Sequence, residues 1–297
     1  MGQYFRRLSL FKYTAILILG AVLSAVPVVI MMASREDGVS LIDDTPLITF
    51  IASLVMYGVW LLMLWYISLS TEERMLIRKP APARSRRKVG FLLAALLWSL
   101  PVNVVYSLFL ERFFPDFLER MMEAGNLPEN LLSTSDPISL LLMFIPVVIL
   151  APIVEEIMFR GILYNLLNKY MSLPLAAVIS SLVFGALHGT TFFQTAVIGF
   201  VLAVVYQVTG DLKMAMLGHA VNNGVAFLQG ILLSEGYLET GSPGELILAS
   251  IFLLGALVMI VRTVLYLRRN SLRSIFRDRS PMYKHEIAFH LAKEEVI

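Results

Sequence analysis

Long stretches of apolar residues recur along the chain, and they restrict it to a membrane fold. A helix needs roughly 20 residues to cross a hydrocarbon core ~30 Å thick. Apolar runs bounded by charged residues or by Pro and Gly clusters predict eight membrane helices, at 13–33, 47–69, 89–110, 138–168, 173–188, 193–209, 212–233 and 246–267. We therefore expect an all-α polytopic membrane protein whose fifth and sixth helices are short and closely joined.

The composition supports this fold and excludes several functions. Hydrophobic residues make up 58% of the chain and charged residues 15%, whereas about a quarter of a soluble domain is charged. The 24 Lys and Arg nearly balance the 22 Asp and Glu, and the basic residues bunch between apolar runs, which argues against a nucleic-acid partner. Because the chain has no Cys, it has no thiol nucleophile and no thiolate metal ligand.

The distribution of basic residues predicts the orientation in the membrane. Segments 1–12 and 71–88 are rich in Lys and Arg, whereas segments 34–45, 111–137 and 234–245 are acidic. Since short cytoplasmic loops carry the excess of basic residues, both termini are expected to be cytoplasmic. The apolar run at 13–33 is longer than the core of a signal peptide, so we interpret it as an uncleaved anchor.

The chain divides into four parts on this pattern, and no internal repeat is apparent. N-terminal helices and loops are expected at 1–137, a catalytic core at 138–233, a last membrane helix at 234–267 and a cytoplasmic tail at 268–297.

Ionisable residues within the apolar runs are concentrated in the second half of the chain. They are Glu155, Glu156, Arg160, His188 and His219. Charges at membrane depth cost several kcal/mol and usually mark a site or a pathway. Glu156 and Arg160 are four residues apart, so they share a helix face and can pair. Glu155 is turned by ~100° and points elsewhere.

Helix geometry allows these residues to converge. If the chain turns at 170–172, Glu155 lies ~20 Å before the turn and His188 ~24 Å after it, at similar depth. His219 and Asn223 share one face of a later helix, and tilt can bring His219 within reach. A carboxylate, two imidazoles and an amide can activate water and stabilise an oxyanion, which predicts amide hydrolysis without a covalent intermediate. Glu155, His188 and His219 could equally ligate zinc, and the residues leave both chemistries open.

Three motifs carry a resemblance to a known family. They are Glu155-Glu156-x-x-x-Arg160, Phe184-x-x-x-His188 and His219-x-x-x-Asn223. All occur in apolar segments and in the order of the signature motifs of the CPBP family, the CAAX proteases and bacteriocin-processing enzymes, also called the type II CAAX prenyl endopeptidase or Abi family. The resemblance covers about 138–233. It implies an α-helical intramembrane endopeptidase whose glutamate-dependent active site opens to the cytoplasm.

The resemblance also implies roles for the motif residues. Glu155 resembles the base that activates water, with His188 as its partner, and His219 with Asn223 resembles the oxyanion hole. Supporting roles are implied for Glu156, Arg160 and Phe184. No cofactor is required by this interpretation, although zinc remains an alternative. The expected partners are a peptide or protein substrate and membrane lipid, in a bacterial cytoplasmic membrane.

Other interpretations of the same residues remain. A catalytically silent scaffold or bacteriocin-immunity protein could use the same fold to bind a partner. A proton-coupled transporter also uses intramembrane Glu and His, although the chain lacks the repeats of many transporters. In the structural interpretation, Arg160 and Lys169 neutralise the carboxylates, and the two histidines are hydrogen-bonding residues between helices.

Overall fold

The computed structural model describes residues 5, 7–33, 45–78, 112–116 and 136–234, with scattered positions between 250 and 284. Every regular element in this part of the chain is helical, as the sequence predicts. The predicted helix at 89–110 lies outside the described residues, as do most of the predicted helix at 246–267 and most of the tail from 268. The predicted division of the chain into four parts stays a prediction.

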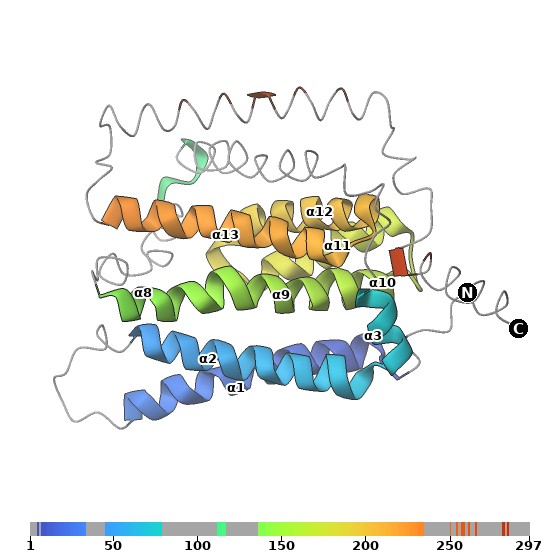
Figure 1. Cartoon of the computed structure of the whole chain (residues 1–297), viewed down its shortest axis with the longest axis horizontal. Helices are drawn as coiled ribbons and strands as arrows, with labels where there is room; N and C mark the ends of the chain where they lie inside the picture. Colours follow the sequence, from blue (N-terminus) through green and yellow to red (C-terminus); the bar gives the residue numbers. More distant parts are fainter. Residues whose placement is uncertain are drawn as a thin grey trace, which may run out of the picture.

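Apart from the short α3, the described helices lie roughly along one common direction (Figure 1). The elements are α1 (Leu10–Ala33), α2 (Thr45–Trp60), its π-helical continuation Leu61–Ser68, α3 (Thr71–Arg78), α8 (Pro137–Phe144), the π-helical stretch Ile145–Leu150, α9 (Ala151–Glu156), the π-helical stretch Ile157–Leu163, α10 (Tyr164–Leu167), α11 (Leu173–Ala186), a 3₁₀ turn (Gly189–Thr191), α12 (Phe192–Thr209) and α13 (Leu212–Ser234). Elements α8 to α10 follow one another without a break, so 137–167 forms one long helix.

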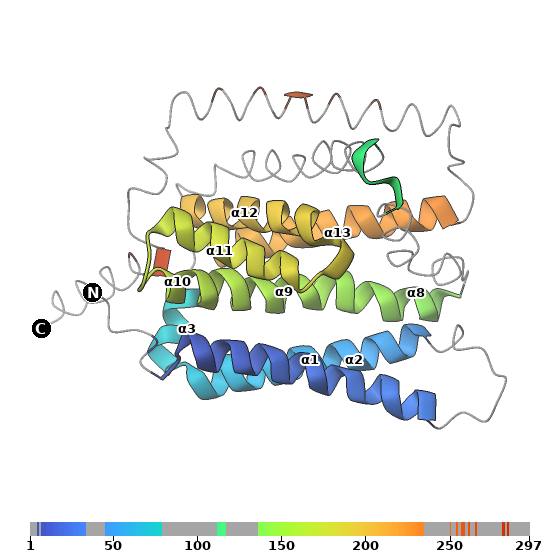
Figure 2. The ribbon, with the colours of Figure 1, turned by 180° about the vertical axis from the view of Figure 1, so that it is seen from behind.

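This long helix is the middle layer of the bundle. Helices α1 and α2 pack together on one side of it, and α11, α12 and α13 cover the other side (Figures 1 and 2). Helix α2 contacts α8 and α9, while α13 contacts α9 and the π-helical stretches beside it. Side chains from both outer layers can therefore reach the centre of the long helix.

Four described stretches are long and apolar enough to cross a membrane: Leu10–Ile30, Pro46–Ser68, Pro137–Leu167 and Phe192–Thr209. Helix α11 is apolar but shorter, and α13, which carries His219 and two asparagines, is not among the four. Large apolar side chains on α1, such as Val22 and Ile30, face outward, as in a lipid-facing helix. The chain is an integral membrane protein, while the total of eight helices and the cytoplasmic termini stay predictions.

The long helix begins at a well-defined cap. The carboxylate of Asp136 accepts hydrogen bonds from the backbone N–H of Ile138 at 3.4 Å and of Ser139 at 2.9 Å, and Pro137 occupies the first turn. Hydrogen bonds from the Ser139 hydroxyl and the two backbone N–H groups hold the pKa of Asp136 below its usual value. This cap fixes where the helix that carries Glu155 begins.

A close approach of backbones joins α11 to α12. A Cβ placed on Gly185 would lie 2.5 Å from the carbonyl oxygen of Phe192 and 2.9 Å from Cβ of Ala196. Only glycine fits at such a distance, which is the usual reason for small residues between membrane helices. The contact fixes the end of α11, where His188 follows.

Candidate active site

Two adjacent buried glutamates occupy α9, in the middle of the long helix. Glu155 is 6% exposed and Glu156 is fully buried. The π-helical stretches on either side of α9 contain Pro146 and Arg160. Pro146 lies in the first turn of the π-helical stretch before α9 and Pro152 in the first turn of α9, and the long helix continues through both.

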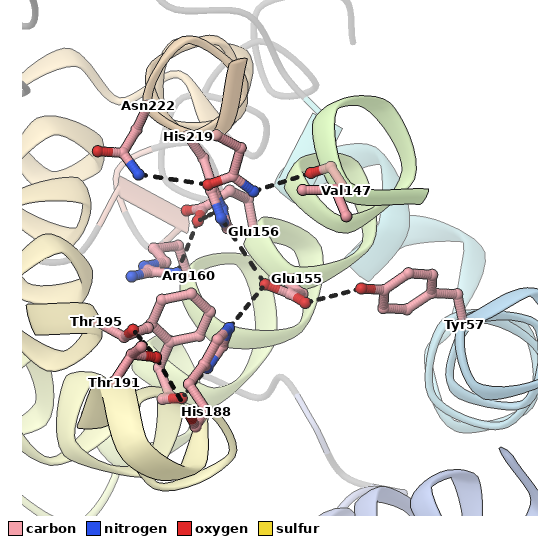
Figure 3. Close-up of polar contacts among 12 residues, drawn as sticks. Tyr57, Val147, Glu155, Glu156, Arg160, His188, Thr191, Thr195, His219 and Asn222 are labelled. Atoms are coloured by element: carbon pink, nitrogen blue, oxygen red, sulfur yellow. Dashed lines mark hydrogen bonds and ion pairs between the residues drawn. The ribbon is translucent and has the colours of Figure 1, made fainter. Parts of the chain in front are cut away.

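Glu156 is neutralised within the protein. Its Oε1 accepts a hydrogen bond from Arg160 Nη1 at 2.7 Å and lies 3.0 Å from Nδ1 of His219 (Figure 3). Arg160 also donates from Nη2 to the carbonyl oxygen of Gly199 at 2.8 Å, and its guanidinium lies 4.5 Å from the ring centroid of Phe184. The structure thus contains the intrahelical pair that the four-residue spacing predicts.

Glu155 points towards α2, and one of its oxygens has no hydrogen-bond donor among the described residues. Its Oε1 accepts a hydrogen bond from the hydroxyl of Tyr57 at 3.0 Å. Its Oε2 is buried, and no donor among the described residues lies within hydrogen-bond distance. That oxygen faces Nε2 of His188 at 4.0 Å and Nε2 of His219 at 3.9 Å (Figure 3). The structure therefore brings together three residues from three different helical segments.

His188 stands just beyond the end of α11. The helix stops at Ala186, and Gly189 has φ +56°, which favours glycine and turns the chain into the 3₁₀ segment. Nδ1 of His188 donates to the carbonyl oxygen of Phe184 at 2.7 Å, because a carbonyl can only accept. In the neutral ring Nε2 is then an acceptor aimed at Glu155. The His188 side chain is 32% exposed, so the site is reachable from this edge.

His219 comes from α13 and is 4% exposed. Its Nδ1 donates to Glu156 Oε1, since the ionised carboxylate held by Arg160 accepts hydrogen bonds. The Nε2 of the neutral ring is therefore also an acceptor directed at Glu155. Both imidazoles present the same kind of atom to the same carboxylate oxygen.

Asn223 lies one turn beyond His219 and contacts the long helix. Its Nδ2 donates to the carbonyl oxygen of Val147 at 2.9 Å, and its Oδ1 accepts from Nδ2 of Asn222 at 3.3 Å. Val147 belongs to the π-helical stretch before α9, whose carbonyls are not all used by the helix itself. One hydrogen of the Asn223 amide is thus used by the scaffold.

Phe184 is the aromatic centre between these polar groups. The centroid of its buried ring lies 4.7 Å from the ring centroid of His188, 5.6 Å from that of His219 and 4.9 Å from that of Phe159. These contacts restrict the rotation of both imidazoles. Phe184 therefore helps to fix the positions of both imidazoles.

Sequence reasoning missed three contributors to the site. Tyr57 on α2 contacts Glu155, Gly199 on α12 accepts from Arg160, and Tyr13 on α1 donates to the carbonyl oxygen of Met158 at 3.1 Å. Two of these contributors, Tyr13 and Tyr57, lie on helices outside the segment 138–233 that the motifs span. Spacing along one helix does not relate a tyrosine to a carboxylate far away in the sequence, so no local feature of the sequence predicts these contacts.

The groups that face the gap are farther apart than zinc ligands usually are. No group of three or more His, Cys, Asp or Glu in the described part of the chain is arranged to hold a metal ion. Zinc bonds of ~2.0–2.1 Å would place tetrahedral ligands ~3.4 Å apart. The separations from Glu155 Oε2 to the two Nε2 atoms are wider, at 3.9 and 4.0 Å.

Comparisons with known proteins agree with the motifs. A family model described as "Type II CAAX prenyl endopeptidase Rce1-like" matches residues 137–225, which contain every motif residue named above. The curated protein "Putative membrane peptidase YdiL" of Bacillus subtilis (strain 168) is 28% identical over 164 residues, which is 54% of this chain and 66% of that relative. No solved structure matches the chain. The chain spans just under two thirds of that relative's length, and both matches support a relation of segment 137–225 to the CPBP/CAAX protease family.

Proposed function

We propose that the protein is an intramembrane endopeptidase that hydrolyses a peptide bond of a membrane-associated or peptide substrate. The observation that carries this proposal is the buried Glu155 Oε2, which has no donor among the described residues and faces both imidazole Nε2 atoms at about 4 Å. Two acceptors ~4 Å apart can share one water molecule through hydrogen bonds of ~2.8 Å.

Water activation uses the open oxygen of Glu155. The water donates one hydrogen bond to Glu155 Oε2 and a second to Nε2 of His188, which holds it in place. As the water oxygen attacks the carbonyl carbon of the substrate, its proton passes to Glu155 Oε2. The new C–O bond converts the carbonyl into a tetrahedral oxyanion.

The oxyanion is stabilised by donors from α13. His219 donates from Nε2 when it carries a second proton, and the Glu156 carboxylate on its Nδ1 balances that charge. Asn223 contributes the amide hydrogen that is not used on Val147. These donors act in a largely buried site, where hydrogen bonds to a developing charge are stronger than in water.

Collapse of the intermediate completes the reaction. Glu155 returns its proton to the nitrogen of the leaving amine, the C–N bond breaks, and a carboxylic acid and an amine are released. One water is consumed for each peptide bond, and no covalent enzyme intermediate forms. Glu156 and Arg160 position His219 and do not touch the reacting atoms.

The same proposal extends to cofactor, partners and location. The side chains supply every step above, so the proposed mechanism requires no cofactor. No step uses zinc, because Nε2 of His188 and of His219 lie farther from Glu155 Oε2 than zinc ligands lie from one another. The partners are a peptide or protein substrate and membrane lipid, without nucleic acid. The location that fits the family and the apolar helices is a bacterial cytoplasmic membrane.

The test compares peptide N-termini by mass spectrometry in membranes from cells that make wild-type protein or Glu155→Ala at matched levels. New N-termini that are present with wild type and absent with Glu155→Ala would be the products of cleavage. The matched control is Glu72→Ala, because Glu72 is an exposed glutamate on α3 away from the site. Identical profiles for all three proteins would contradict the proposal.

A nearly isosteric variant separates catalysis from binding. Glu155→Gln keeps the shape of the site and removes the base, so it should abolish the same N-termini. If the cellular phenotype survives in Glu155→Gln while no N-terminus depends on Glu155, the protein acts as a scaffold or immunity protein.

A further inference from the structure

The phenol of Tyr57 reaches Glu155 from a helix that the family match does not include. Tyr57 lies on α2, and its hydroxyl donates to Oε1 of Glu155 at 3.0 Å across 98 residues of sequence. We propose that Tyr57 is a positioning residue that selects Oε2 of Glu155 as the oxygen that takes the proton from water. This inference rests on the proposed endopeptidase function.

A free carboxylate offers two equivalent oxygens, and the site must distinguish them. The hydrogen bond from Tyr57 occupies Oε1 and fixes the plane of the carboxylate, so Oε2 alone is directed into the gap between His188 and His219. Donation also draws electron density towards Oε1. Because both Tyr57 and Glu155 are buried, this hydrogen bond is stronger than it would be in water.

The position of Tyr57 is itself fixed by α1. Its ring packs edge-on against Trp60, with centroids 5.8 Å apart, and Nε1 of Trp60 donates to the carbonyl oxygen of Leu17 at 3.2 Å. Gly20 makes room for that indole, since a Cβ there would lie 2.2 Å from Trp60 Nε1. A chain of contacts therefore runs from α1 through Trp60 and Tyr57 to the catalytic carboxylate.

On this geometry, Tyr57 should affect the rate of the chemical step and have little effect on substrate binding. Without the hydroxyl, Glu155 can rotate about its last side-chain torsion and present either oxygen at the wrong angle. A misplacement of about 1 Å near reacting atoms costs up to about 100-fold in rate. The substrate meets the edge of the site at the partly exposed His188, so its affinity should change little.

The experiment uses Tyr57→Phe, which removes only the hydroxyl, in the full-length protein reconstituted into liposomes. The probe is a synthetic peptide spanning the cleavage junction found by the N-terminal comparison of wild type and Glu155→Ala. We expect kcat to fall about 10- to 100-fold with KM close to wild type, measured well below the thermal unfolding midpoint, which the loss of one buried hydrogen bond should lower. Tyr66→Phe is the control, because Tyr66 is exposed on the same continuous helix, and it should keep kcat within about twofold.

A second variant tests the hydroxyl separately from the packing. Tyr57→Ala opens space beside Glu155, and added phenol should raise its kcat while toluene, which has the ring without the hydroxyl, should not. A purely structural role would predict equal rescue by both compounds or none. Either result, or a wild-type kcat in Tyr57→Phe, would overturn the inference.

The outcomes separate this inference from the function on which it rests. If Glu155→Ala removes N-termini and Tyr57→Phe does not slow their formation, the endopeptidase stands and the role of Tyr57 is wrong. If Glu155→Ala removes none, both proposals fail together.

Discussion

At the scale of single residues, the two adjacent glutamates have different environments. Among the described residues each has a buried Oε2 without a donor, but the charge of Glu156 is balanced by Arg160 and a hydrogen bond from His219, whereas Oε2 of Glu155 faces the Nε2 atoms of two imidazoles. Removing one partner of a buried ion pair is far more costly than removing a surface pair, because a buried charge is left alone. Arg160 is therefore expected to stabilise the fold, because its loss would leave Glu156 as an unpaired buried charge. Gly199 leaves the space that the Arg160 guanidinium occupies.

Gly199→Ala should disturb this pair directly. The added Cβ would lie 3.0 Å from Cδ1 of Phe184 and 3.1 Å from Nη2 of Arg160, so the ring and the guanidinium must each shift by a few tenths of an ångström and strain the hydrogen bond to the Gly199 carbonyl. We expect a loss of about 1–3 kcal/mol in the free energy of unfolding, typical of overpacking in a filled core. Denaturant unfolding in mild detergent measures this loss.

Gly58→Ala is the matched control for that measurement. Gly58 lies within α2, and a Cβ there would have nothing within 4 Å among the described residues. Alanine is a better helix former, so this change should be neutral or stabilising by up to about 1 kcal/mol. Equal effects of the two changes would show that the contact of Gly199 with Arg160 has no energetic importance.

At the scale of elements, the long helix departs from α geometry on both sides of α9. π-Helical turns are rare and occur often at functional sites, and they leave carbonyl groups that need other partners. Here Asn223 donates to Val147, Tyr13 donates to Met158, and Asn165 donates to Arg160 and Gly161. Side chains from α1, α13 and the helix itself therefore stabilise the distorted segments.

Tyr13→Phe should loosen the second π-helical stretch without creating a cavity. The carbonyl of Met158 would lose a buried hydrogen bond, which costs about 1 kcal/mol net and more if the oxygen stays unsatisfied. We expect a lower thermal unfolding midpoint and a smaller loss of cleavage than in Tyr57→Phe. Tyr170→Phe, at a 62% exposed position, is the control and should match wild type. An unchanged midpoint in Tyr13→Phe would contradict this role.

At the scale of the whole molecule, the distribution of charge predicts how the bundle sits in the membrane. Segment 34–45 is acidic and segment 71–88 is basic, so the first should face outward and the second the cytoplasm. Alkaline phosphatase fused after residue 40 should therefore be active, and the same enzyme fused after residue 82 should be inactive. Green fluorescent protein at the C-terminus should fluoresce. The reverse pattern would invert the predicted topology.

Much of the architecture could be predicted from the sequence, because apolar length and i,i+4 spacing are local properties. They predicted the helical class and the Glu156 to Arg160 pair, and the estimated depths allowed Glu155 and His188 to meet. The contact from Tyr57 could not be predicted, since it depends on how α2 packs against the long helix. The π-helical turns were also missed, because Pro146 and Pro152 indicate a disturbed helix without saying how it is accommodated.

The π-helical turns have a consequence for how the protein can change over evolution. Such a turn holds one residue more than the α-helical turn it replaces, so the two stretches around α9 set the angular phase between the glutamates and the rest of the long helix. Adding or removing a residue in α9 itself would rotate everything beyond it by ~100° relative to Glu155, whereas loss of the extra residue of a π-helical turn would leave an α-helical turn. Changes in the length of α9 should therefore be tolerated less well than substitutions that preserve size. The spacing between Glu155 and Arg160 should therefore outlast the identity of most residues around it.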